Sequence, residues 1–323
     1  MDAALSMLAA SLLVPTILFF VLGMLAAVAR SDLSIPDGAA KVMSIYLLFA
    51  IGFKGGASLI SNEITWQIVA TLLAGMVLSF LLPFIAFFLL RVLTRLDDVN
   101  AAAVAGHYGS ISIVTFVTAS SLLELNVMVA EGYLVAVAAV MEVPAILSAL
   151  WIAGTRGVRA QSQSKLLRDI VGNGSIVLLV GSFIIGVITG QEGLNDVKPF
   201  IIVPFTGILC LFLLDMGLSA GRSLVENRKS LTGGLFAFGC IMPLVGCFAG
   251  YATGWILGLS QGGVFLMMVL SASASYIAVP AAMKIALPQA QSGIYLTMSL
   301  GVTFPFNIAV GLPFYLWLAK GAS

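Results

Sequence analysis

The spacing of apolar stretches is the feature that most constrains this chain. Stretches of about 18–30 residues with few charges alternate with short polar connections, and a helix needs about 20 apolar residues to cross a bilayer. Hydrophobic residues make up 60% of the chain and charged residues 9%, whereas soluble domains carry about 25% charged residues. The sequence therefore predicts an all-α polytopic membrane protein with ten transmembrane helices. We expect them at residues 5–29, 38–60, 65–94, 100–123, 127–154, 173–190, 197–221, 231–257, 262–286 and 290–318.

Basic residues are distributed unequally between the two sides of these helices. Lys54, Lys198 and Lys320 fall on the side of the N-terminus, and the other twelve of the fifteen basic residues fall on the opposite side. Lys and Arg are enriched in cytoplasmic connections. We therefore expect both termini outside the cell, residues 155–172 as a cytoplasmic linker, and insertion into the inner (plasma) membrane.

The linker separates two halves, residues 1–154 and 173–323, that share a sparse internal repeat. A shift of 161 positions superposes Ser110 on Ser271 and Ser112 on Ser273, with Gly132 on Gly293 and Pro144 on Pro305. Each half holds five expected helices, an odd number, so the halves must insert with opposite orientations. The sequence thus predicts a 5+5 inverted repeat. Such repeats are typical of secondary transporters, which bind substrate near the bilayer midplane where the repeats meet.

Two stretches inside expected transmembrane helices, residues 109–121 and 270–280, are rich in hydroxyl side chains. Ser competes for backbone hydrogen bonds, and Pro280 cannot donate one. Irregular backbone at membrane depth is tolerated only where protein buries it or where it lines a cavity. We therefore expect two broken crossing helices that face one another around a small solute. The alternative is that these small residues only allow close helix packing.

The broken stretches suggest the chemistry of that solute. Half-helix N-termini and hydroxyl groups favour an anion. Neither stretch contains Lys or Arg, which a large dianion would need, so a small monoanion is expected. The candidate substrate-binding residues are Gly109, Ser110, Ser112, Thr115, Ser271, Ser273, Ser275 and Tyr276.

Acidic and amide side chains in the expected helices suggest a cation site. Carboxylates at membrane depth are costly and usually functional, and Glu142 lies within a helix just before Pro144. The candidate cation-binding residues are Glu142, Asp215, Thr303 and Asn307. A hydrogen-bonded structural role is the alternative for Glu142, and a proton-coupling or structural role is the alternative for Asp215. We expect Lys54 to reach outward to the interface and His107 to be packed, with a pH-sensitive gate as the alternative for His107.

Several function classes are disfavoured. The chain has one His and three Cys, without the spacing of zinc or haem ligands, so no cofactor or structural metal is expected beyond a coupling Na⁺. A net charge of +1 gives no reason to expect nucleic-acid binding. The pattern Gly-x-Ser-x-Gly occurs at Gly217–Gly221, but there it lies in an expected transmembrane helix and not at the strand-to-helix turn of a serine hydrolase. A paired-aspartate motif is also lacking, so we expect no enzyme. A passive channel would conduct far faster than a carrier turns over.

Four stretches carry a resemblance to a known family: Gly106–Thr115, Met141–Pro144, Ser273–Pro280, and Tyr295 through Pro305 into Ile308–Gly311. With them the sequence resembles the sodium-dependent bicarbonate transporter family over nearly its whole length. The resemblance implies ten transmembrane helices in an inverted repeat, core and gate regions, a homotrimer and Na⁺-coupled bicarbonate uptake. It further implies that bicarbonate lies between the broken helices, at Gly109, Ser112, Thr115, Ser273 and Ser275.

The sequence departs from this family pattern at one motif. Family members carry three consecutive Ser and then Asp where this chain has Ser273-Ala274-Ser275-Tyr276, so an uncharged phenol replaces a carboxylate. We therefore predict Na⁺-coupled symport of bicarbonate or a similar small monoanion by alternating access. The alternative is the same fold with a small organic carboxylate as substrate, or with H⁺ as coupling ion.

Overall fold

A computed structural model describes residues 13–59, 65–155, 174–227, 231–277, 279–280, 283 and 287–321. Within these ranges the chain is helical and contains no β-strand, so the predicted all-α class is confirmed. Seven helices are long and apolar enough to cross a membrane, and three shorter apolar helices accompany them. The count of ten spans stays a prediction, and nearly all of the expected linker 155–172 lies outside the described residues.

The first half of the chain contains seven described helices. Two of its expected spans are interrupted, one between α5 and α6 and one between α7 and α8. The helices are α2 (Pro15–Val28), α3 (Asp37–Leu59), α4 (Trp66–Leu93), α5 (Asp98–His107), α6 (Ile113–Leu125), α7 (Leu134–Val140) and α8 (Glu142–Thr155).

The second half has an interruption after α13 and ends in a helix with two π-helical turns. π-Helical segments are rare and are frequently found at functional sites, and Pro305 and Pro313 remove backbone donors beside them. The elements are α10 (Gly174–Ile201), α11 (Phe205–Glu226), α12 (Gly233–Ile256), α13 (Gln261–Ala272), α15 (Ser292–Leu296), η1 (Thr297–Thr303), α16 (Phe304–Phe306), η2 (Asn307–Gly311) and α17 (Leu312–Lys320).

One pair of expected helices has different bounds. We expected a connection at 191–196 and a span at 197–221, but α10 continues to Ile201 and the next helix starts at Phe205. The chain turns sharply within α10 at Gly190, which has φ 61° and ψ −153°. Glycine adopts positive φ without steric cost, so residues 191–201 form a further helical segment that a search for apolar length does not detect.

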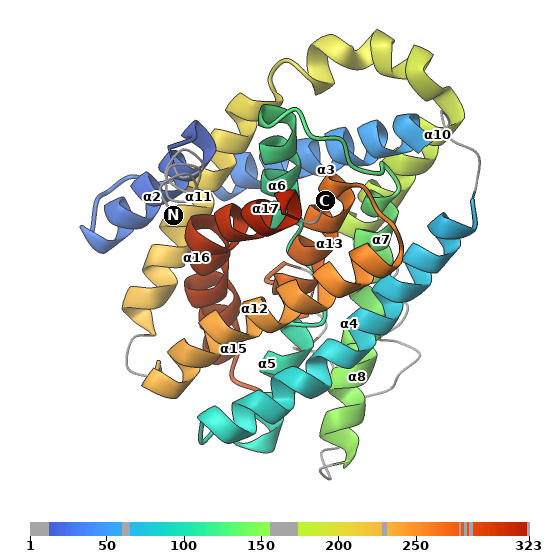
Figure 1. Ribbon diagram of the computed structural model, residues 1–323. Coiled ribbons are helices and arrows are strands. Elements are labelled where there is room, and N and C mark those ends of the chain that lie inside the picture. Colours follow the sequence, from blue (N-terminus) through green and yellow to red (C-terminus); the bar gives the residue numbers. More distant parts are fainter. Residues whose placement is uncertain are drawn as a thin grey trace.

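The helices form two sets. The panel set is α2, α3, α10 and α11, in which α2 packs along α11 and α3 along α10 (Figure 1). Glycines bring these backbones together, because a Cβ atom at Gly23 would lie 2.1 Å from the Leu214 carbonyl oxygen and one at Gly186 would lie 2.3 Å from that of Phe53. The crossing set contains the other described helices, which pack mainly on one another. These are α4, α5, α6, α7, α8, α12, α13 and the C-terminal helix from α15 to α17.

The helices α5 and α13, each of which leads into one of the two serine-rich breaks, both start at a capped N-terminus. Asp97 caps α5 by accepting the Asn100 N–H at 2.9 Å, and the Asn100 side chain accepts the N–H of Gln291 at 2.7 Å. Ser260 caps α13, and its own N–H donates to Glu131 at 2.7 Å. Burial by itself raises the pKa of Asp97, but the hydrogen bonds from Asn100 together with those from the Val99 and Asp97 N–H groups hold the pKa below its usual range. The start of each crossing helix is thus tied to the other half of the chain.

Candidate functional site

The two interruptions expected from the sequence are present and touch one another. Residues 108–112 separate α5 from α6, and the chain leaves helical geometry after Ala272 at the end of α13. The Ser112 N–H donates to Ser273 Oγ at 3.0 Å, and the Ser275 N–H donates to the His107 carbonyl at 2.8 Å. Backbone groups released by one break are therefore satisfied by the other, as burial of irregular backbone requires.

Ser112 holds a central place in this contact. Its Oγ caps α6 by accepting the Thr115 N–H at 3.3 Å and the Thr115 hydroxyl at 2.9 Å. Ser273 Oγ, in turn, donates to the Leu270 carbonyl at 3.1 Å and accepts the Ser112 N–H. A hydroxyl has one proton to donate. The proton of Ser273 is therefore committed to the fold, whereas Ser112 accepts both of its bonds from Thr115 and keeps its own proton for another partner.

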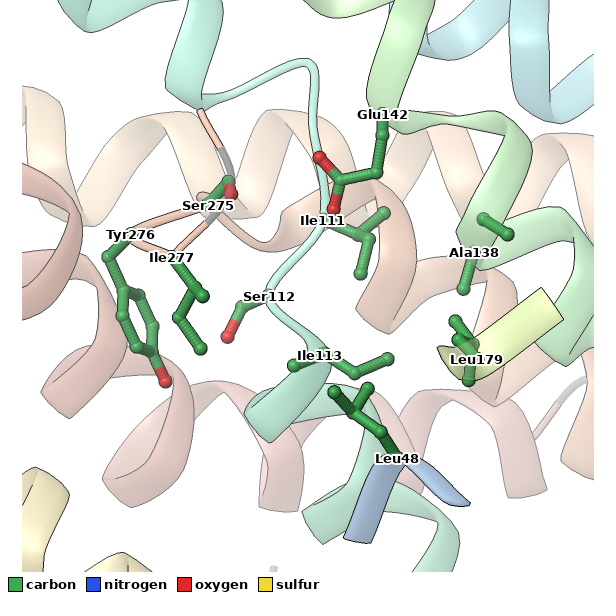
Figure 2. A pocket seen from close by; sticks show the side chains of 11 residues that line it. Leu48, Ile111, Ser112, Ile113, Ala138, Glu142, Leu179, Ser275, Tyr276 and Ile277 are labelled. Atoms are coloured by element: carbon green, nitrogen blue, oxygen red, sulfur yellow. The ribbon is translucent and has the colours of Figure 1, made fainter. Parts of the chain in front are cut away.

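A pocket lies beside this contact. Its volume, measured as the space that the centre of a water molecule can occupy, is about 30 Å³. A single water needs roughly 10–15 Å³ by this measure, so the space suits a small ion. Its polar lining comes from Ser112, Glu142, Ser275 and Tyr276 (Figure 2). The other lining residues are apolar: Leu48, Ile111, Ile113, Ala138, Ala139, Leu179 and Ile277.

The pocket lies between the two helix sets. Leu48 of α3 and Leu179 of α10 belong to the panel set, and the other lining residues belong to the crossing set. These two leucines were not predicted from the sequence, because an apolar residue in an apolar helix carries no sign of its neighbours.

Glu142 supplies the carboxylate of the pocket. It is the first residue of α8 and is 6% exposed, and it accepts a hydrogen bond from the Ser110 hydroxyl at 2.5 Å. Within the described ranges no basic side chain pairs with it. A buried carboxylate without a counter-charge is unfavourable, so this group requires a cation or a proton.

Comparison with known protein families agrees with this arrangement. The family model of the Na⁺-dependent bicarbonate transporter superfamily matches residues 15–320. The chain belongs to this superfamily. A comparison with curated proteins gives no match. The protein is therefore a multi-pass membrane protein of a transporter family and not an enzyme.

In this member of the superfamily, Tyr276 lines the pocket where the family resemblance leads one to expect an aspartate. Its ring packs against Phe304 at 5.1 Å between centroids. Its hydroxyl lies beside that of Ser112 but makes no hydrogen bond of good geometry with a described residue. A buried phenol without a partner is available to donate to a solute.

Four further predicted substrate residues differ in their surroundings. Ser110 and Thr115 bind Glu142 and Ser112, as described above, and Ser271 has a buried hydroxyl without a hydrogen-bond partner among the described residues. At Gly109 a Cβ atom would lie 2.4 Å from Pro83 Cγ. Gly109 therefore allows the chain to pass closely over α4.

Three of the four candidate cation-binding residues lie away from the pocket lining. The Thr303 hydroxyl donates to the Gly239 carbonyl at 2.8 Å and accepts from the Tyr108 hydroxyl at 2.6 Å. Asp215 is half-buried on α11 and forms no ion pair or hydrogen bond within the described residues. The structure thus brings Glu142 into the pocket and gives Thr303 other partners.

Asn307 is used to hold an interrupted helix. Its side-chain N–H donates to the Ala272 carbonyl at 2.9 Å, at the end of α13, and its oxygen accepts from the Tyr315 hydroxyl at 2.8 Å.

His107 is fully buried, with Nδ1 2.7 Å from the Ala103 carbonyl and its ring stacked on Tyr295. The expectation that His107 is packed agrees with this environment.

Proposed function

We propose that the protein is a secondary active transporter that couples Na⁺ to the symport of bicarbonate, or a similar small monoanion, across the inner membrane. The observation that carries the proposal is the pocket at the contact between the two interrupted helices. It combines the hydroxyls of Ser112 and Tyr276 with the buried carboxylate of Glu142, and its described lining contains no Lys or Arg. Such a site offers neutral donors to an anion and a negative group to a cation.

The anion site consists of the N-terminal end of α6 and the neighbouring hydroxyls. Ser112 caps this 13-residue helix, so the unpaired N–H groups and the positive end of the helix dipole lie beside the pocket. Ser112 and Tyr276 add hydroxyl protons. A monoanion fits this set of neutral donors better than a dianion does, because a dianion normally requires Arg or Lys.

The cation site is centred on Glu142. Na⁺ bound there neutralises a carboxylate whose described partner is the Ser110 hydroxyl. The same positive charge lowers the cost of moving an anion from water into the pocket, since charges interact more strongly at low dielectric constant. Binding of the two ions is therefore cooperative, and this cooperativity couples their transport. Asp215, Thr303 and Asn307 then act outside the first coordination shell.

Alternating access follows from a 5+5 inverted repeat with both termini outside. The glycine contacts support the repeat, because the pairing is exchanged between halves. Gly23 of the first half approaches Leu214 of the second, and Gly186 of the second half approaches Phe53 of the first. Movement of the panel set against the crossing set would open the pocket to each side in turn. A homotrimer remains the expected assembly.

The test is uptake of labelled bicarbonate into proteoliposomes. We expect uptake to require an inward Na⁺ gradient and Glu142→Gln to abolish that requirement together with most of the uptake. The matched control is Glu226→Gln, at the end of α11 and away from the pocket, which should transport normally. Equal uptake with Na⁺ absent from both sides would reject Na⁺ coupling.

The second candidate function keeps the same fold but takes a small organic carboxylate as substrate, or H⁺ as coupling ion. The apolar lining and Tyr276 are the observations that suit it. Seven of the eleven lining residues are Leu, Ile or Ala, a lining that suits a small organic carboxylate, and Glu142 without a described counter-charge suits a proton. Competition by formate, acetate and lactate against labelled bicarbonate distinguishes the substrates. A pH gradient imposed without Na⁺ distinguishes the coupling ions.

A further inference from the structure

A second cavity lies between the helix sets and shares no lining residue with the pocket. It has a volume of about 220 Å³ and is enclosed by α3, α6, α7, α13 and the connection that precedes α7. Its polar lining consists of Lys54, Ser58, Ser120, Glu124 and Glu131. The distribution of basic residues places this end of the protein on the outside.

Among the described residues, Lys54 is the only basic residue that lines this cavity. Its two described partners belong to different helix sets. Its ammonium group forms an ion pair with Glu124 of α6 in the crossing set. It also lies 5.1 Å from the centre of the Phe205 ring, on α11 of the panel set. The cation–π contact holds Lys54 on its own set whether or not Glu124 is in place.

The ion pair is suited to breaking and reforming. The Glu124 side chain is 54% exposed and that of Lys54 is 24% exposed, and ion pairs open to water contribute little to stability. When Glu124 turns into water its charge is solvated, and Lys54 is left in the cavity without an anionic partner among the described residues.

Glu131 does not take the place of Glu124. Its two carboxylate oxygens accept the Ser260 N–H at 2.7 Å and the Ser260 hydroxyl at 3.1 Å, at the N-terminus of α13. Charge-assisted bonds at a helix N-terminus hold a carboxylate firmly. The exchangeable negative group beside Lys54 is therefore Glu124.

We propose that this cavity is an outer anion-binding site, in which an entering monoanion replaces the Glu124 carboxylate on Lys54. The exchange removes the ion pair between α3 and α6 and lets the panel and crossing sets separate at the outer end. The identity of the anion rests on the proposed function. The exchange itself requires only a monoanion small enough for the cavity.

Two variants with opposite expected effects test the proposal in proteoliposomes. Lys54→Gln removes the capturing cation and should raise the KM for external bicarbonate about threefold, whereas Glu124→Gln removes the competing carboxylate and should lower it by a similar factor. The control is Lys198→Gln, which removes an exposed positive charge of α10 away from the cavity and should behave like the unaltered protein. Measured at saturating bicarbonate, the KM for Na⁺ should not change in any of the three. Shifts of the Lys54 and Glu124 variants in the same direction, or no shift in either, would overturn the proposal, as would a change confined to Na⁺.

A second measurement does not depend on transport. Ser120 lines the cavity, so Ser120→Cys should react faster with a membrane-impermeant maleimide when bicarbonate is added, and Lys54→Gln should remove this acceleration. The unaltered protein, with Cys210, Cys240 and Cys247, provides the background rate. If the protein carries no bicarbonate but the labelling accelerates, the proposed function fails and the outer site stands. If transport proceeds and the labelling is unchanged by bicarbonate, the outer site fails.

Discussion

At the scale of single residues, the serines of the second break have different tasks although the sequence makes them look alike. Ser273 Oγ both donates and accepts within the protein, whereas Ser271 Oγ is buried without a partner among the described residues. Neither residue lines the pocket. Ser273 therefore joins the two breaks, and the serine and tyrosine hydroxyls of the pocket lining are those of Ser112, Ser275 and Tyr276.

This difference predicts different consequences for alanine substitutions at Ser273 and Ser271, two positions apart. Ser273→Ala leaves the buried Ser112 N–H without an acceptor, which costs about 1–3 kcal/mol, so thermal unfolding in detergent should occur at a lower temperature. Ser271→Ala removes a hydroxyl that gains nothing from burial, and stability should stay the same or rise. Equal destabilisation by both substitutions would contradict the hydrogen bond between the breaks.

Residue types predicted part of the site. Polar groups in an apolar span are costly and usually functional. For this reason the sequence pointed to four residues of the pocket lining: Ser112, Ser275, Tyr276 and Glu142. It did not point to their partners, since partners depend on how distant segments cross. Asn307, expected to bind a cation, instead donates to the carbonyl of Ala272, and no local pattern indicates that bond.

At the scale of helices, apolar length predicted most spans because each helix satisfies its own backbone in lipid. It failed at α10, where a change of direction depends on the φ angle of Gly190 rather than on hydrophobicity. It also gave no sign of the π-helical turns in η1 and η2. The structure places Gly23 and Gly186 at close helix crossings, which apolar length does not indicate either.

Two glycines of α10 provide a matched test of these crossings. A Cβ atom at Gly186 would lie 2.3 Å from the Phe53 carbonyl oxygen, while one at Gly181 would meet nothing within 4 Å. Gly186→Ala should force α3 and α10 apart at a cost of about 1–3 kcal/mol. Gly181→Ala should be neutral or stabilising by about 0.5–1 kcal/mol, because Ala favours the helix. The thermal unfolding midpoints of the two variants check this, and similar midpoints would refute the crossing.

At the scale of the whole molecule, the panel and crossing sets touch through polar contacts at both ends of α11. Lys54 lies over Phe205 at its start and pairs with Glu124. Ser223, near its end, lies with its hydroxyl 3.2 Å from that of Thr297 in η1. With a rise of about 1.5 Å per residue, these points are roughly 27 Å apart along the helix. Both contacts are made in this structure, and alternating access requires them to break in turn.

The contact between Ser223 and Thr297 allows the inner end to be held closed. Hydroxyl oxygens 3.2 Å apart place the two side chains close enough for a disulfide between Ser223→Cys and Thr297→Cys. Oxidation should join α11 to η1, prevent release of the solute to the cytoplasm and reduce uptake to under about 10% of its rate before oxidation, because a carrier that cannot open on one side completes no cycle. Uptake should return on reduction, and each single variant should be insensitive to oxidant. Full uptake with the disulfide formed, as judged by thiol labelling, would mean that the panel and crossing sets do not separate at this end.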